Sequence, residues 1–112
     1  MELPDADRAT VAREKITAYL LVPRATNDKA GFFERFGFSV DRWEDFARLL
    51  RQHAMSGRVT EICHNPYGAT YAVEGMMDTP SGRRIFVRSM WMIDVGSNVP
   101  RFTTAMPGTE WE

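Results

Sequence analysis

The sequence predicts an α+β domain in which about three N-terminal helices pack on one face of a four-stranded antiparallel meander sheet. Apolar residues recur at helical spacing before Gly57 and at every second position after it. The connections in the second half are rich in Gly, Pro and Asn and are about two to five residues long, which forces antiparallel neighbours. The length of 112 residues and the 44% hydrophobic content indicate a single domain over residues 1–112.

The first helix is expected from residue 11 or 12 to residue 21, after a polar lead-in arm. The apolar positions there recur at three- and four-residue intervals: Ala12, Ile16, Tyr19 and Leu20. Pro23 follows and ends the pattern, because the residue before a proline disfavours the helical conformation.

A second, short helix is expected to present three phenylalanines to a core: Phe32, Phe33 and Phe36. Asp28 stands where it can cap the start of this helix. Gly37 stands where a left-handed residue can end it.

The third helix is expected to begin at Asp41, which forms a capping-box pattern with Glu44, and to end before Gly57. Its apolar stripe consists of Trp43, Phe46, Ala47, Leu50 and Ala54. His53 lies beside this stripe, and we expect it to be a partly exposed surface residue.

Four strands are expected, over residues 58–64, 69–77, 83–95 and 100–106. The third is the most informative, because apolar residues occupy both of its faces. One face carries Ile85, Val87, Trp91 and Ile93, and the other carries Arg84, Phe86, Arg88, Met90 and Met92. Such a strand is central, with helices over the first face and a second face partly open to solvent or to a ligand.

Composition excludes several classes of function. A net charge of -1 and a pI near 6.1 provide no long-range attraction for nucleic acid, so such binding would need a local patch. Cys63 is the one cysteine, which excludes an internal disulfide. It forms no recognised metal-binding spacing with His53 and His64, and there is no Gly-rich phosphate loop or Gly-x-Ser-x-Gly motif, so no metal or cofactor is expected.

The first thirty residues contain acidic residues and no apolar stretch typical of a signal peptide. No apolar run approaches the roughly 18 residues that a membrane span requires. We therefore expect no membrane partner and a cytoplasmic location.

A basic patch is the strongest candidate for chemistry. Arg84 and Arg88 share one face of the third strand, and Arg101 begins its expected neighbour, so three guanidinium groups can gather there. Guanidinium forks bind phosphate and can stabilise the charge of a phosphorane during RNA cleavage. Thr103, two residues after Arg101, would share its face and offer a hydroxyl. The alternative is a solvated face on which these arginines pair with Glu61, Glu74 or Asp94.

Two further residues have both a chemical and a structural interpretation. Lys29 stands at a helix start next to the phenylalanines. It is either a phosphate contact or an exposed solubilising residue. His64 stands at a strand end before Asn65-Pro66, as an acid or base or as part of the turn.

Short motifs along nearly the whole chain resemble an uncharacterised bacterial domain family of unknown function. They are Leu3-Pro4, Lys15-Ile16 with Tyr19-Leu20-Leu21, Lys29-Ala30 before Phe32-Phe33, Gly37-Phe38, Tyr67-Gly68 with Tyr71, Trp91, and Pro100-Arg101 with Thr104-Ala105. Such domains look like stand-alone small bacterial proteins and like the C-terminal tips of filamentous-haemagglutinin-type polymorphic toxins. The order of helices then sheet is also similar to the barnase, colicin and RelE group of ribonuclease toxins, an analogy of fold alone.

The resemblance implies functional roles for Lys29, Arg88, Arg101 and Thr104. In a regular strand Thr104 faces away from Arg101, so one of the two would be structural unless a bulge intervenes. The sequence departs from the family pattern at two places: Asp28 stands where a histidine is common, and Met106 where a tyrosine is. If either residue does chemistry in the family, this chain lacks it.

The leading hypothesis from the sequence is a toxin-like, metal-independent ribonuclease domain with RNA as its partner. His64, Arg88 and Arg101 are its candidate catalytic residues, and the candidate phosphate-binding residues are Lys29, Arg84, Thr103 and Thr104. The alternative is a non-catalytic binding or immunity/antitoxin-like module. In that case the face with Phe86, Met90 and Met92 meets a protein partner, since adjacent exposed apolar groups mark such surfaces.

Overall fold

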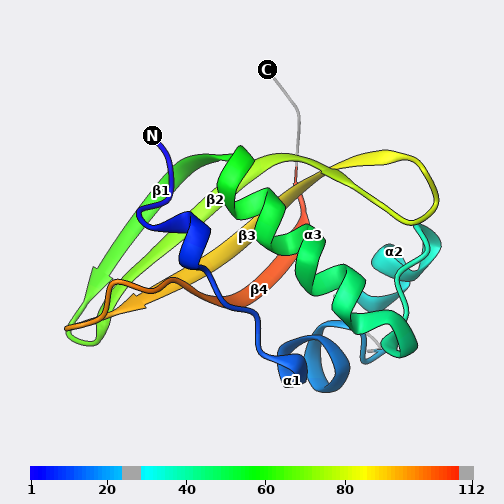
Figure 1. Cartoon of the computed structure of the whole chain (residues 1–112), viewed down its shortest axis with the longest axis horizontal. Helices are drawn as coiled ribbons and strands as arrows, with labels where there is room; N and C mark the ends of the chain where they lie inside the picture. The colour runs from blue at the N-terminus through cyan, green and yellow to red at the C-terminus, as the bar shows by residue number, and fades with distance from the viewer. Residues whose placement is uncertain (24–28, 109–112) are drawn as a thin grey trace.

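A four-stranded antiparallel sheet forms the second half of the protein, as expected. The structure is a computed structural model that describes residues 1–23 and 29–108. The strands are β1 (Arg58–Asn65), β2 (Gly68–Asp78), β3 (Arg84–Asp94) and β4 (Arg101–Pro107), and they pair in the order β1-β2-β3-β4. Figure 1 shows α3 crossing in front of this sheet, with α1 and α2 beyond its β4 side. The predicted α+β meander is confirmed.

The helical elements precede the sheet. They are η1 (Ala6–Arg8), α1 (Arg13–Lys15), η2 (Ile16–Leu20), α2 (Lys29–Arg35), η3 (Val40–Arg42) and α3 (Trp43–Ser56). Within the described ranges, no helix has the length and apolar character needed to cross a membrane.

The first helix differs from the regular helix expected up to residue 21. After one turn of α1 it widens into the π-helical turn η2, in which the Leu21 amide donates to the Ile16 carbonyl at 2.9 Å. Ile16, Leu20 and Leu21 are all buried. The wider turn allows three large apolar side chains to reach the core, which outweighs its poorer backbone geometry.

The helix α2 ends as predicted at Gly37, whose φ is 99°. The amide of Phe38 donates to the Phe33 carbonyl and the amide of Gly37 to that of Glu34, which is the Schellman arrangement. The rings of Phe33 and Phe38 lie 6.0 Å apart and complete its apolar contact. The predicted cap at Asp28 lies outside the described residues.

The predicted capping box at Asp41 and Glu44 is wrong. The chain first makes the 3₁₀ turn η3, for which Ser39 is the N-cap residue, and α3 then begins at Trp43. Asp41 therefore lies within the 3₁₀ turn and is not the N-cap of α3, whose N-cap residue is Arg42 and which has no side-chain cap bond.

The core lies between α3 and the sheet. Its largest fully buried side chains include Phe33, Phe46, Trp91 and Phe102. The N-terminal arm closes this layer, because the Met1 carbonyl accepts from Val59 of β1 at 2.7 Å and the Thr10 amide donates to Pro100, just before β4, at 2.9 Å. The arm thus crosses the helix-covered face from one sheet edge to the other (Figure 1).

His53 is a core residue, so its predicted place on the surface is wrong. It is 1% exposed on α3, and its Nε2 lies 3.1 Å from the Gly75 carbonyl oxygen and 3.0 Å from that of Val87. Since carbonyls only accept, Nε2 carries the proton, and the neutral ring accepts at Nδ1 from the Ser89 hydroxyl at 2.8 Å. The Trp91 indole N–H donates to the same hydroxyl at 2.8 Å. Full hydrogen bonding is what permits a buried imidazole here.

This network predicts that the free energy of unfolding decreases as the pH is lowered into the mildly acidic range. Burial lowers the pKa of His53 from its ordinary value of 6.5, against the opposing effect of the bonds to Gly75 and Val87. The unfolded chain therefore binds a proton first as the pH falls. The stabilisation present above pH 6.5 is lost progressively below it, by at most about 1.4 kcal/mol per pH unit.

Chemical unfolding at several pH values checks this expectation. The two histidines provide matched variants: His64→Gln, at an exposed site, should keep the dependence near pH 6, and His53→Gln should lose it. An equal dependence in both variants would contradict the assignment to His53.

Candidate functional site

One face of the sheet carries most of the predicted site residues, and we call it the open face because α3 packs on the other. Directly opposed residues of antiparallel strands share a face. The register places one connected set there: Glu61, Cys63, Thr70, Glu74, Arg84, Phe86, Arg88, Met90, Met92, Arg101, Thr104 and Met106. The open face is turned away from the viewer in Figure 1.

The three arginines of the predicted patch are all paired. Arg88 and Arg101 pair with carboxylates named in the alternative interpretation, whereas Arg84 pairs with Asp78, which that interpretation did not include. Arg88 Nη1 donates to Glu74 Oε2 at 2.7 Å and its Nη2 to Glu61 Oε1 at 2.6 Å. Arg84 Nε lies 3.1 Å from Asp78 Oδ1. Arg101 donates through Nε and Nη2 to the two oxygens of Asp94, at 2.8 and 3.1 Å.

These pairs hold the charges in place. The hydrogen bond with Glu74 raises the pKa of Arg88 above its ordinary value, an effect that burial opposes and the bond with Glu61 reinforces. The hydrogen bond from Arg101 lowers the pKa of Asp94. Among the described residues, Arg88 uses two of its five N–H donors in these bonds, and the others can bind a further anion.

A bulge in β4 changes which threonine belongs to the open face. Thr104 is opposite Met90 whereas Phe102 is opposite Trp91, so the register skips Thr103. The hydroxyl of Thr103 donates to the Met90 carbonyl at 3.1 Å and so stabilises the bulge. The regular alternation that would pair Thr103 with Arg101 is therefore wrong here. Thr104 shares the face of Arg101 instead, because the extra residue reverses the alternation.

Thr104 belongs to a three-membered polar cluster with Lys29 and Tyr19. The Lys29 ammonium donates to the Tyr19 hydroxyl at 3.1 Å and to Thr104 Oγ1 at 3.1 Å, and the two hydroxyls are 3.0 Å apart. The ammonium also lies 5.4 Å from the centre of the Tyr19 ring. The elements η2, α2 and β4 supply one residue each, so the cluster forms where these elements meet.

The cluster and the central arginine are neighbours on the open face. Arg88 is two positions from Met90, the residue opposite Thr104, which makes it a diagonal neighbour of Thr104. Such neighbours lie about 7–8 Å apart, within reach of long side chains. Arg101 is opposite Met92, which is two positions from Met90 on the other side, so Arg101 is also a diagonal neighbour of Met90. Arg88, Arg101 and the Lys29 cluster thus surround Met90 and offer cationic and hydroxyl donors to an anion.

Of the other predicted residues, His64 lies off the open face, and Arg84 lies on it but away from Met90. His64 is opposite Ala69, which is opposite Ile93, so it shares the helix-covered side of the sheet and is exposed near the strand end. Arg84 pairs with Asp78 near the far end of β3. Met92, expected on the exposed surface, is only 7% exposed. The departure at Met106 falls within the site, because Met106 is opposite Arg88.

Sequence reasoning missed Tyr19 as a site residue. Its spacing with Ile16 and Leu20 is typical of a core-facing helical position, and it lies 85 residues from Thr104. No local motif marks such a pairing; the motif Tyr19-Leu20-Leu21 carried only the family resemblance.

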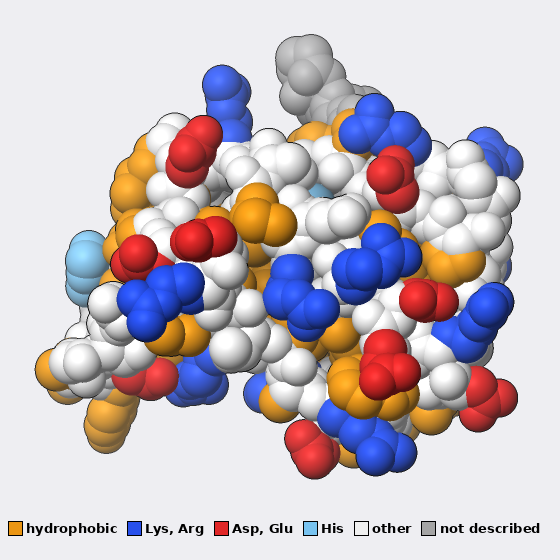
Figure 2. All heavy atoms as spheres, in the orientation of Figure 1, with side chains coloured by type: hydrophobic (Ala, Val, Ile, Leu, Met, Phe, Trp, Pro, Cys, Tyr) orange, Lys and Arg blue, Asp and Glu red, His pale blue; other side chains and the backbone are white. Residues whose placement is uncertain are grey.

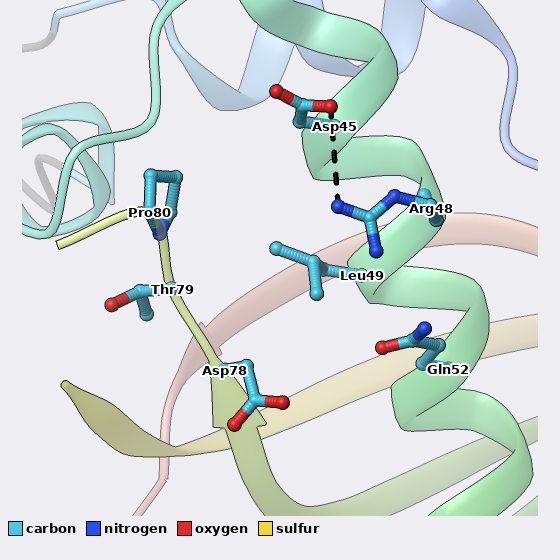
Figure 3. Close-up of a pocket in the computed structure, with 7 residues that line it drawn as sticks. All are labelled: Asp45, Arg48, Leu49, Gln52, Asp78, Thr79 and Pro80. Carbon is cyan, nitrogen blue, oxygen red and sulfur yellow. Dashed lines mark ion pairs between the residues drawn. The ribbon is translucent and has the colours of Figure 1, made fainter. Parts of the chain in front are cut away.

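A pocket of about 330 Å³ lies on another part of the surface. It is lined by Asp45, Arg48, Leu49 and Gln52 of α3 and by Asp78, Thr79 and Pro80 (Figure 3). Acidic and basic side chains alternate over the face that carries α3 (Figure 2), and none of the site residues predicted above lines this pocket. The described ranges also contain no group of three or more metal-ligating side chains.

The fold is similar to that of a solved structure, and a family model matches the sequence. A solved chain of a contact-dependent growth inhibition toxin–immunity protein complex from Klebsiella pneumoniae 342 is similar to it, with a TM-score of 0.73 and 20% sequence identity. The similarity covers 93% of this chain and 97% of that chain, so it extends over the whole fold. No curated protein matches the sequence. The model of the domain of unknown function family DUF6883 matches residues 2–109, and the chain belongs to that family.

Proposed function

We propose that this member of the DUF6883 family is a toxin-like ribonuclease domain that cleaves RNA phosphodiester bonds on the open face of its sheet. One observation carries the proposal. The bulge at Thr103 brings Thr104, with Lys29 and Tyr19 bonded to it, onto the face that holds Arg88 and Arg101. The four residues implied by the family resemblance therefore converge, although they are far apart in the sequence.

The arrangement suits a phosphodiester undergoing substitution at phosphorus. The unused N–H donors of Arg88 can bind the non-bridging oxygens and stabilise the charge that they gain in the phosphorane. The Lys29 ammonium, which is hydrogen-bonded to two hydroxyls, supplies a second positive charge and a proton source for a leaving oxygen. His64 has no part in this arrangement, because it lies on the other side of the sheet.

The charge balance of the open face predicts how RNA binds. Since Arg84, Arg88 and Arg101 each have a carboxylate partner, little net positive charge attracts RNA from a distance. Binding then depends on hydrogen bonds at one phosphate. The affinity should fall only weakly with salt, and the slope of its logarithm against the logarithm of the salt concentration should correspond to about one phosphate contact.

Incubation of the purified protein with total tRNA and rRNA tests the proposal. We expect discrete cleavage products. Arg88→Ala should lower the rate about 100-fold or more, since it removes the central hydrogen-bond donor to the phosphate. Arg48→Ala is the control, because Arg48 lies on α3, is more than half exposed and pairs only weakly, at 4.0 Å, with Asp45. Intact RNA in all samples, with no growth defect on expression in a bacterium, would refute ribonuclease activity.

A second candidate function is a non-catalytic immunity-like binding module. The observation that favours it is the same charge balance, with half-buried Phe86 and Met90 among paired charges on the open face. Such a face suits a protein partner better than a polyanion. Light scattering after size-exclusion chromatography, alone and with a candidate toxin, separates the two: a stable heterodimer together with uncleaved RNA supports this function, and a monomer that cleaves RNA rejects it.

A further inference from the structure

We propose that Glu74 is the general base that accepts the proton of the attacking RNA 2′-hydroxyl, which makes it a catalytic residue absent from the set predicted by sequence. This inference rests on the proposed ribonuclease function and specifies its chemistry. It derives from the position of one carboxylate relative to Arg88 and the Lys29 cluster.

Glu74 lies at the centre of the open face with one oxygen held and one available. It is opposite Arg88 in the register, and its Oε2 accepts from Arg88 Nη1 at 2.7 Å. The side chain is 24% exposed, so the guanidinium fixes it without removing it from solvent contact. Within residues 1–23 and 29–108 no hydrogen bond to Oε1 is present. That oxygen can take a proton from a bound hydroxyl.

The neighbouring carboxylate, Glu61, is the weaker candidate. It is on the edge strand β1, 56% exposed, and both of its oxygens have partners: Arg88 Nη2 at 2.6 Å and the Cys63 thiol at 3.7 Å. Both glutamates thus pair with the same guanidinium, but in the part of the chain that the structure describes Glu74 alone of the two has an oxygen without a partner. This difference makes Glu61 a matched control for the positioning of Arg88.

The spacing suits a phosphate held between a base and an acid. Glu74 is on β2, Arg88 on β3 and Thr104 on β4, and Thr104 is offset from the Glu74–Arg88 pair by two residues along the strand. The backbones of the base and of Thr104 are therefore about 12 Å apart. Their side chains can lean towards a phosphate that Arg88 binds between them. A nucleophile can then enter on the Glu74 side while the leaving oxygen departs on the Lys29 side, which is the in-line geometry.

The reaction balances without a co-reactant. Glu74 Oε1 accepts the proton of the 2′-hydroxyl, the 2′-oxygen forms a bond to phosphorus, and the bond from phosphorus to the 5′-oxygen breaks. The leaving 5′-oxygen receives a proton from the Lys29–Tyr19–Thr104 cluster. The products are a 2′,3′-cyclic phosphate and a 5′-hydroxyl, and transfer of the accepted proton through water restores both groups.

Cleavage of a mixed-sequence oligoribonucleotide with a fluorophore and a quencher at its ends, followed across pH, tests the inference. Glu74→Gln keeps a hydrogen-bonding side chain opposite Arg88 and should lower kcat/KM by about 100-fold or more. It should also remove the acidic limb of the pH profile, where the wild-type rate falls as the base is protonated. Glu61→Gln should keep the limb and stay within about tenfold of the wild-type rate.

The outcomes separate the inference from its premise. If the wild-type protein leaves the oligoribonucleotide intact, the proposed function fails and the inference fails with it. If the wild type cleaves while Glu74→Gln keeps both rate and acidic limb, only the inference is overturned. Equal losses in the two glutamine variants, with the limb retained, would show that Glu74 merely positions Arg88. A 5′-phosphate on the product would also overturn it.

Discussion

Replacing Lys29 by methionine should lower the rate of RNA cleavage by about 10²–10³-fold while leaving the fold intact. The change removes the ammonium that stabilises the leaving oxygen, a contribution of the size found for preorganised donors in other active sites. The hydroxyls of Tyr19 and Thr104, 3.0 Å apart, can still bond to each other, so no buried polar group is left without a partner. Single-turnover cleavage of an oligoribonucleotide provides the measurement.

Lys15→Met is the matched control for this experiment. Lys15 and Lys29 are the two lysines of the chain. The Lys15 ammonium lies 5.8 Å from the centre of the same Tyr19 ring. Both variants lose one positive charge beside Tyr19, but only Lys29→Met removes the bonds to the two hydroxyls. Equal activities of the two variants would show that net charge alone matters.

Replacing His53 by alanine should cost about 3–5 kcal/mol of the free energy of unfolding, the largest effect on stability that we expect. The change opens a cavity under α3 and removes the ring that bonds the Ser89 hydroxyl and the Gly75 and Val87 carbonyls. Urea denaturation measures the loss. Gln52→Ala, one position earlier at an exposed site, should change stability by about 0.5 kcal/mol or less. A cost below about 1 kcal/mol for His53→Ala would contradict the structural role of the network.

The sheet was predictable because its signals are local. Gly and Pro in the connections and the period of two in β3 set both the strand limits and the two faces of Ile85 and Arg88. The same pattern left the charge pairing open as an alternative, with Glu61, Glu74 or Asp94 as partners, and the register then places Glu74 opposite Arg88.

Residues whose position depends on tertiary contacts were not predictable in the same way. His53 has the polarity of a surface residue, and only the meeting of α3 with Gly75, Val87 and Ser89 supplies the partners that make it a core residue. The capping pattern at Asp41 failed for a related reason, because a preceding 3₁₀ turn had already begun the helix.

The candidate site combines both kinds of signal. The arginines lie on one face by simple alternation, but the extra residue in β4 that selects Thr104 over Thr103 leaves no mark in the sequence. The union of Tyr19, Lys29 and Thr104 depends on the π-helical turn and on where α2 meets β4. Only the assembled fold brings these three side chains together.

Binding of a non-cleavable 2′-deoxy oligonucleotide, mapped residue by residue through amide chemical-shift changes, tests the open face as the RNA-binding surface most directly. We expect the changes to concentrate on Arg88, Met90 and Thr104 and on the start of α2 at Lys29. Changes confined to the helix-covered side, around α3 and His64, would contradict it.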